Sequence, residues 1–172
     1  MRQRGQSLIE LAVATPLLIW LLLGAFDTAV MVSDKVIAGA ACRQGARLAA
    51  EIGGQSTNPG MLTSTADNDV VRNVLAVAQA MNYSTITDIY IYAPSNPNGD
   101  YTPGDPVDHF NGAGTLLNPP GSFPLTARSQ VPPTESPIGV RIEWNYVPPT
   151  GLASFSIHLS EHTTFLASPV LP

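Results

Sequence analysis

An uncharged apolar run near the N-terminus constrains the fold of this chain more than any other feature. Residues 11–26 contain no charged side chain, and Glu10 and Asp27 bound the run. A helix that crosses a bilayer needs about 20 apolar residues, and apolar neighbours on both sides extend the run to that length. We therefore expect a membrane-spanning helix over about residues 8–32.

A secretory signal peptide also combines a basic start with an apolar core, and Arg2 and Arg4 supply such a start here. Three features argue against it. The apolar core is long, Glu10 stands at its beginning, and residues 26–28 (Phe-Asp-Thr) offer no small-x-small cleavage site. Because the two arginines abut the membrane run, we expect a single pass through the inner (cytoplasmic) membrane, with the N-terminus in the cytoplasm and the head outside.

The helical pattern continues beyond the membrane run. Residues 34–52 are rich in helix formers and contain no proline, and Gly53-Gly54 predicts the end of the helix. We expect one helix from about Ser7 to Ile52, about 70 Å long at about 1.5 Å per residue. Pro16 lies inside it and removes one backbone donor, which predicts a kink.

Glycines and arginines along this helix are candidates for helix packing. Small residues permit close helix–helix contact, and chance composition is the alternative. Arg43, Arg47 and Glu51 fall four residues apart on one helical face. The two arginines either belong to a solvated face with an Arg47–Glu51 ion pair or have a packing role. The positions assigned to packing are Pro16, Gly24, Gly39, Gly45, Arg43 and Arg47.

The remainder of the chain predicts a small head of α+β class. Residues 67–81 carry apolar side chains at three- and four-residue spacing, which predicts an amphipathic helix capped by Thr65 or Asp67. Residues 85–93 are rich in isoleucine, threonine and tyrosine, which predicts a strand.

Two alternating segments and a long loop complete the predicted head. Residues 138–147 and 155–167 alternate apolar with polar side chains, which predicts an antiparallel hairpin. Residues 94–137 contain ten of the sixteen prolines, which predicts a long Pro/Gly-rich loop. We therefore expect a long membrane-spanning helix, one further helix and an antiparallel sheet of about three strands.

Composition argues against several classes of function. The net charge of −5 lacks the basic face that a nucleic-acid partner needs. Cys42 is the only cysteine, which excludes an intrachain disulfide and a cysteine-based zinc site. It is either a small packing residue or a thiol that cross-links. No nucleophile–base set and no glycine-rich phosphate loop is visible, so we expect no catalytic site, no cofactor and no small-molecule substrate.

Two metal sites can be considered and neither is expected. His158 to His162 reads H-x-x-E-H, which binds zinc only on a helix. The alternation around it predicts a strand, in which residues four apart lie about 13 Å from each other. Oxygen ligands for calcium occur in the long loop, but their spacing fits no standard calcium loop and predicts solvated turns. These residues are Asn96, Asn98, Asp100, Asp105 and Asp108.

The segment before the apolar run resembles the N-terminus of type IV prepilins. Their leaders end in glycine after basic residues, and a glutamate stands five residues into the mature chain. Gly5 matches the last leader residue, Gln6 the new N-terminus and Glu10 that glutamate. The resemblance implies cleavage between Gly5 and Gln6 by a prepilin peptidase. It also implies that Glu10 pairs with the new amine of a neighbouring subunit, since a carboxylate in hydrocarbon needs a partner.

The wider pattern resembles the TadE-like family. The matching blocks are residues 5–12, Thr-Pro-Leu-Leu at 15–18, Leu-Leu-Leu-Gly at 21–24 and Ala-Ala-Cys-Arg-Gln-Gly-Ala-Arg at 40–47. The resemblance implies a minor pilin (pseudopilin) of a tight-adherence, Flp-type pilus, which takes part in pilus assembly and surface adhesion. Its partners would be other pilins, the assembly machinery, the peptidase and the membrane.

The chain then divides into a leader at residues 1–5, a helix at residues 6–52 and an extracytoplasmic head at residues 53–172. The alternative function is a membrane-tethered extracytoplasmic binding module with an uncleaved signal anchor.

Overall fold

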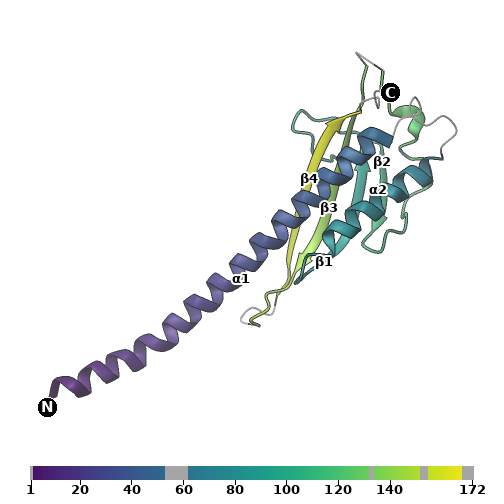
Figure 1. The fold of residues 1–172 in the computed structure, drawn as a ribbon. Coiled ribbons are helices and arrows are strands. Elements are labelled where there is room, and N and C mark those ends of the chain that lie inside the picture. The colour runs from purple at the N-terminus through teal and green to yellow at the C-terminus, as the bar shows by residue number, and fades with distance from the viewer. Residues whose placement is uncertain (1, 53–61, 132–133, 152–154, 168–172) are drawn as a thin grey trace.

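One helix runs the length of the molecule, and its C-terminal half lies on a four-stranded sheet (Figure 1). This computed structural model describes residues 2–52, 62–131, 134–151 and 155–167, with side chains from residue 8 onward. The elements in chain order are α1 (Arg2–Ile52), α2 (Thr63–Ala78), β1 (Ser84–Tyr92), β2 (Val107–Asn111), the short 3-10 helix η1 (Leu125–Ala127), β3 (Pro137–Tyr146) and β4 (Ile157–Leu166).

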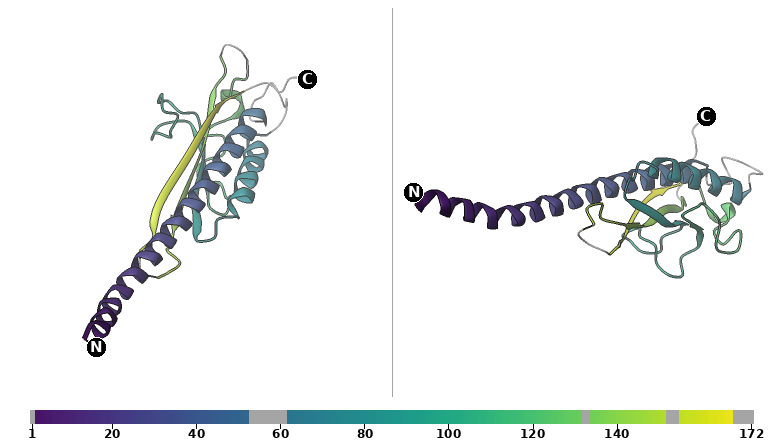
Figure 2. Two further views of the ribbon diagram at one scale, coloured as in Figure 1. Left: turned by 60° about the vertical axis from the view of Figure 1, so that its left-hand side comes forward. Right: turned by 90° about the horizontal axis from the view of Figure 1, so that it is seen from below.

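Helix α1 contains 51 residues and begins at Arg2, earlier than the predicted Ser7. Its first half is rich in leucine and alanine, which favour helix, and it continues through Pro16. The ribbon curves gently in this half (Figure 2). The helix extends to Ile52 within the described residues, and the predicted stop at Gly53-Gly54 lies outside them.

The sheet is antiparallel throughout, in the order β2-β1-β3-β4, and both helices cover the same face of it (Figures 1 and 2). The alternation predicted for β3 places Val140, Ile142 and Trp144 inward, each 0% exposed. Small side chains on α1 allow the helix to lie close to the sheet. The fully buried residues of this helix are Ala38, Ala41, Cys42, Ala46 and Ala49.

The predicted α+β class and the β3–β4 hairpin are confirmed. The sheet has four strands instead of about three, because β2 lies within the segment predicted to be loop. β2 has only five residues, Val-Asp-His-Phe-Asn, and prolines surround it, so neither length nor alternation marks it in the sequence.

The predicted caps of α2 are wrong. The helix begins at Thr63, four residues before the predicted start, and its N-cap is Leu62, whose side chain makes no capping hydrogen bond in the described structure. Thr65 and Asp67 lie inside the helix. Asp67 is 1% exposed and binds a buried arginine, so its side chain is directed into the head.

The core crosses the predicted boundary between helix and head. Residues 38–50 of α1 pack against α2, β3 and β4, and they supply one wall of the hydrophobic core. The division after residue 52 stays a prediction about domains. A head that keeps its whole core begins at or before Asp34.

Candidate functional site

The N-terminal half of α1 projects beyond the head (Figure 1). From residue 8 to residue 26 every side chain is exposed except the half-buried Leu23. This part of the helix is long and apolar enough to cross a membrane, and none of its most hydrophobic window is buried. Exposure of apolar surface to water costs about 25 cal/mol per Å², so this many exposed leucines are unfavourable in water. The helix therefore indicates a membrane-anchored protein.

The predicted cleavage and pairing residues lie at the start of this projecting helix. Gly5 and Gln6 are both within α1, and the side chain of Gln6 lies outside the described ones. Glu10 is exposed, one turn further along. The predicted cleavage between Gly5 and Gln6 would require the first turn of α1 to unwind, because a peptidase acts on extended backbone. Helix ends fray at little cost.

The three predicted packing glycines have different surroundings. A Cβ added at Gly45 would lie 2.4 Å from Val74 Cγ2, so α1 touches α2 there. At Gly39 the nearest atom would be Arg43 Nη1 at 3.6 Å, an ordinary contact. At Gly24 no described atom lies within 4 Å of that position. Gly45 therefore packs within the head, and packing of Gly24 against another subunit stays a prediction.

Arg43 and Arg47, the two arginines assigned to packing, are exposed in this single chain. Arg47 Nε donates to Glu51 Oε1 at 2.8 Å, which forms the ion pair that the spacing predicts. An exposed pair of this kind contributes about 0.3–0.5 kcal/mol. The solvated-face interpretation accounts for this geometry, and a packing role for Arg43 and Arg47 between subunits stays a prediction.

Asp27 attaches the head to α1 at the end of the apolar run. Its Oδ1 accepts a hydrogen bond from the backbone N–H of Thr150 at 3.3 Å, and its Oδ2 accepts one from the Thr150 hydroxyl. The backbone carbonyl of Asp27 accepts a hydrogen bond from the hydroxyl of Tyr146 at 2.7 Å. The turn between β3 and β4 is therefore attached to the helix.

Asp34 forms a second attachment seven residues further along, on the same face of the helix. It is 1% exposed and accepts hydrogen bonds from the backbone N–H groups of Asn82 and Tyr83, both at 3.3 Å, and from the hydroxyl of Ser84 at 2.7 Å. Together with Asp27 it fixes the direction in which α1 leaves the head.

A buried ion cluster ties the opposite side of the head together. Arg128 donates to both carboxylate oxygens of Asp67, at 2.7 and 3.0 Å, and to Asp108 Oδ2 at 3.2 Å. It also donates to the carbonyl of Phe123 at 2.7 Å. The three charged side chains are at most 2% exposed. The cluster joins α2, β2 and the segment before β3.

Burial raises the pKa of Asp108 to about 7, and the hydrogen bond and charge of Asp67 act in the same direction. The N–H of Phe123 and the charge of Arg128 oppose this rise. Two carboxylates share one guanidinium here, so a proton on Asp108 relieves their repulsion. The pKa of Asp108 is therefore raised toward neutral pH.

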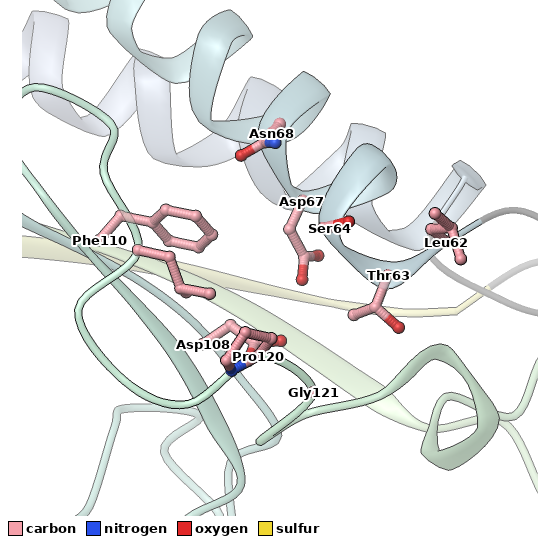
Figure 3. A pocket seen from close by; sticks show the side chains of 10 residues that line it. Leu62, Thr63, Ser64, Asp67, Asn68, Asp108, Phe110, Pro120 and Gly121 are labelled. Atoms are coloured by element: carbon pink, nitrogen blue, oxygen red, sulfur yellow. The ribbon is translucent and has the colours of Figure 1, made fainter.

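A cavity of about 340 Å³ opens beside the cluster, between the start of α2 and the segment after β2 (Figure 3). Asp67 points from α2 toward the segment that carries Pro120. Both carboxylates at the cavity are bound to Arg128, so neither is available as a general base while the cluster is intact. The lining residues are Leu62, Thr63, Ser64, Asp67, Asn68, Asp108, Phe110, Leu116, Pro120 and Gly121.

The histidines of the H-x-x-E-H motif lie on β4, as the alternation predicts. They contact different carboxylates: His158 Nε2 lies 3.4 Å from Glu143 Oε2, and His162 Nδ1 lies 3.6 Å from Asp100 Oδ1. Among the described residues, no three potential metal ligands gather. The strand separates the two side chains, so they do not converge on one metal.

Four of the five oxygen-bearing side chains considered for calcium, those of Asn96, Asp100, Asp105 and Asp108, form hydrogen bonds within the protein. Asn96 donates to the carbonyl of Asp100 at 2.6 Å, which closes a turn, and Asp100 pairs with Arg141 at 3.0 Å. The prediction of solvated turns is wrong for Asp105 and Asp108, which are 7% and 1% exposed.

Cys42 packs in the core at 0% exposed, and its thiol donates to the carbonyl of Glu161 at 3.2 Å. Burial raises the pKa of this thiol to about 12. The geometry agrees with the packing interpretation and leaves the thiol closed to a cross-linking partner.

Sequence reasoning missed the roles of Asp34 and the ion cluster. The signal available for both was an acidic residue that follows a small one, as Asp34 follows Ser33 and Asp67 follows Ala66. That signal does not identify the partner, because Arg128 lies 61 residues away along the chain.

The family model described as TadE-like protein matches residues 5–47 of the chain. No curated protein and no solved structure matches the chain. The predicted TadE-like character of the N-terminal region is confirmed, and the match covers the projecting helix and the part of α1 that packs in the head. It supports a pilus-associated protein.

Proposed function

We propose that this chain is a minor pilin of a tight-adherence pilus, anchored in the inner membrane by α1 with its head outside. The observation that carries the proposal is the exposed apolar half of α1, uncharged from residue 11 to residue 26, within the region that the TadE-like model matches. Lipid covers such a surface before assembly, and the equivalent helices of other pilins cover it afterwards.

Maturation requires cleavage between Gly5 and Gln6. The cut leaves a free amine at the membrane surface, four residues before Glu10. An ionised carboxylate in hydrocarbon costs several kcal/mol unless it is paired. Pairing of Glu10 with the amine of a neighbouring subunit would meet this cost and set the register between the helices.

The attachments at Asp27 and Asp34 make the head follow the helix. Both hold loops of the head by hydrogen bonds to backbone N–H groups and hydroxyls. A displacement of α1 out of the membrane during assembly would therefore carry the head with it. This rigid connection suits a filament subunit.

The intact mass of the chain extracted from membranes tests the proposal against the uncleaved signal anchor. We expect the wild-type mass to correspond to a chain that begins at Gln6. Gly5→Val places a branched side chain before the scissile bond, so it should leave the full-length precursor in the membrane.

Gly24→Val is the matched control, because it makes the same substitution in the same helix at a position with open space. It should be cleaved normally. A wild-type chain that keeps its first five residues would favour the tethered binding module, and normal cleavage of Gly5→Val would show that the assigned site is wrong.

A further inference from the structure

The attachment at Asp27 fixes the height of one turn of the head above the membrane. The 20 residues from Leu8 to Asp27 span about 30 Å as a helix, which is the thickness of the hydrocarbon core. When this segment crosses the bilayer, Asp27 lies at its outer surface. Thr150 is hydrogen-bonded to Asp27, so the turn between β3 and β4 lies there too. Figures 1 and 2 show this turn as the part of the head nearest the N-terminal half of α1.

Exposed apolar side chains gather at this end of the head. Strands β3 and β4 end on the pair Tyr146–Ile157. Val147 follows this pair on one side and Phe155 precedes it on the other, and they are 55% and 61% exposed. Tyr83 is 45% exposed, and its backbone carbonyl accepts a hydrogen bond from the N–H of Val147. We call Tyr83, Val147 and Phe155 the membrane-proximal rim.

We propose that the membrane-proximal rim rests in the outer interface of the bilayer that α1 crosses, as a second contact of the protein with lipid. This inference rests on the proposed membrane insertion of α1. The rim continues the exposed apolar surface of the helix, since Phe26 is 53% exposed and directly precedes the residue to which the turn is bound. Phenylalanine, valine and tyrosine suit this place, because aromatic rings with a polar tip favour the interface and apolar side chains favour the acyl boundary.

A two-point contact would restrict the tilt of α1. A helix held only by its span can tilt over a range of about 40°. With the rim in the interface, the head leans toward the side of α1 that carries Asp27 and Asp34. The subunit would then present one fixed orientation to the assembling filament.

The opposite end of the head provides a matched control. Val131 is 58% exposed, close to the 55% of Val147, but its neighbour Gln130 donates to the carbonyl of Ala50 near the C-terminal end of α1. That carbonyl lies 23 residues beyond Asp27, or about 35 Å further from the membrane.

The test uses the full-length protein in vesicles of phosphatidylethanolamine and phosphatidylglycerol. Single cysteines at exposed positions (Leu18→Cys, Phe155→Cys and Val131→Cys) carry a nitroxide, and Cys42 stays unlabelled because it is buried. The collision rates with oxygen, which concentrates in lipid, and with a water-soluble nickel complex report the depth. We expect the oxygen-to-nickel ratio to be highest at residue 18, to be severalfold higher at residue 155 than at residue 131, and to be lowest at residue 131.

A second variant keeps Phe155 in place. A nitroxide on Val147→Cys should show the same interfacial ratio, and adding Phe155→Asp should lower it severalfold, because the charged side chain opposes insertion.

The outcomes separate this inference from the proposed function. If residue 18 is open to the nickel complex, the membrane insertion fails and the inference fails with it. If residue 18 is in lipid while residue 155 is as open to nickel as residue 131, only the rim contact is overturned. Protection of residue 155 from both reagents would indicate a protein neighbour and would also overturn the assignment to lipid.

Discussion

Removal of the guanidinium from the buried ion cluster should destabilise the head more than any exposed substitution. Arg128 makes four hydrogen bonds between 2.7 and 3.2 Å, and its side chain is 0% exposed. Breaking a buried ion pair by removing one partner costs about 3–5 kcal/mol, because the other charges stay buried without compensation. Arg128→Met leaves Asp67 and Asp108 facing each other, so we expect a loss of about 3–5 kcal/mol.

The control is an arginine that also pairs with an aspartate but is exposed to solvent. Arg72 on α2 is 79% exposed and lies 3.4 Å from Asp69. Arg72→Met should change the free energy of unfolding by no more than about 0.5 kcal/mol. A third variant replaces all three cluster charges, with Arg128→Met, Asp67→Leu and Asp108→Leu combined. It should recover most of the lost stability, since apolar replacement of a whole buried cluster is often neutral.

Denaturant unfolding of a truncated protein that begins at residue 27 measures these differences. This protein keeps Asp27, Asp34 and all of the buried part of α1, so we expect it to unfold cooperatively. We expect the free energies of unfolding of Arg128→Met and Arg72→Met to differ by about 3–5 kcal/mol. A difference of less than about 1 kcal/mol would refute the reasoning. A triple variant as unstable as Arg128→Met would show that packing, and not charge, sets the cost.

Two further predictions concern the helix crossing and the pH dependence. Gly45→Ala should destabilise the truncated protein by about 1–3 kcal/mol in denaturant unfolding, because the added Cβ would lie 2.4 Å from Val74 Cγ2. Gly39→Ala is the control and should be tolerated, because its Cβ would make only ordinary contacts. Equal losses of stability in the two variants would contradict the contact. The pKa of Asp108 rises on folding from an ordinary value of 3.8 to about 7, so the folded state binds the extra proton and its stabilising effect is lost as the pH rises from about 4 to 7. The stability of wild type relative to Asp108→Asn should therefore fall as the pH rises from about 4 to about 7, and a constant difference would contradict the shift.

The elements that could be predicted from the sequence are those in which one residue pattern continues without interruption over many residues. The apolar run before Asp27 and the alternation from Ile138 to Trp144 each repeat one pattern over many residues, and both α1 and β3 form as expected. β2 was missed because its five residues carry only Val107 and Phe110 as apolar positions. It becomes a strand by pairing with β1, and the local sequence of β2 does not reveal this contact.

Parts of the candidate site could be predicted where the interacting residues are close in the sequence. They could not be predicted where the partners are far apart along the chain. The ion pair between Arg47 and Glu51 follows from their spacing alone, whereas the cleavage after Gly5 rests on a resemblance and stays a prediction. The burial of Asp67 does not follow from spacing, because its partner approaches only when the chain folds. The role of Asp34 does not follow either, because it binds Asn82, which lies 48 residues away along the chain.

The most direct test of the proposed pilin function is assembly of the chain with other pilins when Glu10 is replaced. Glu10→Ala removes a charge from the membrane run, so it should insert at least as well as wild type. It should also be cleaved, because Gly5 and Gln6 are unchanged. Asp69→Ala, an acid-to-alanine change on α2 outside the membrane run, is the matched control.

The measurement is co-purification of the chain with other pilins from cells, normalised to its abundance in the membrane. We expect wild type and Asp69→Ala to co-purify equally, and Glu10→Ala to be present in the membrane at wild-type level, processed, and absent from the assemblies. Co-purification of Glu10→Ala at the wild-type level would contradict the pairing role and would favour a tethered binding module.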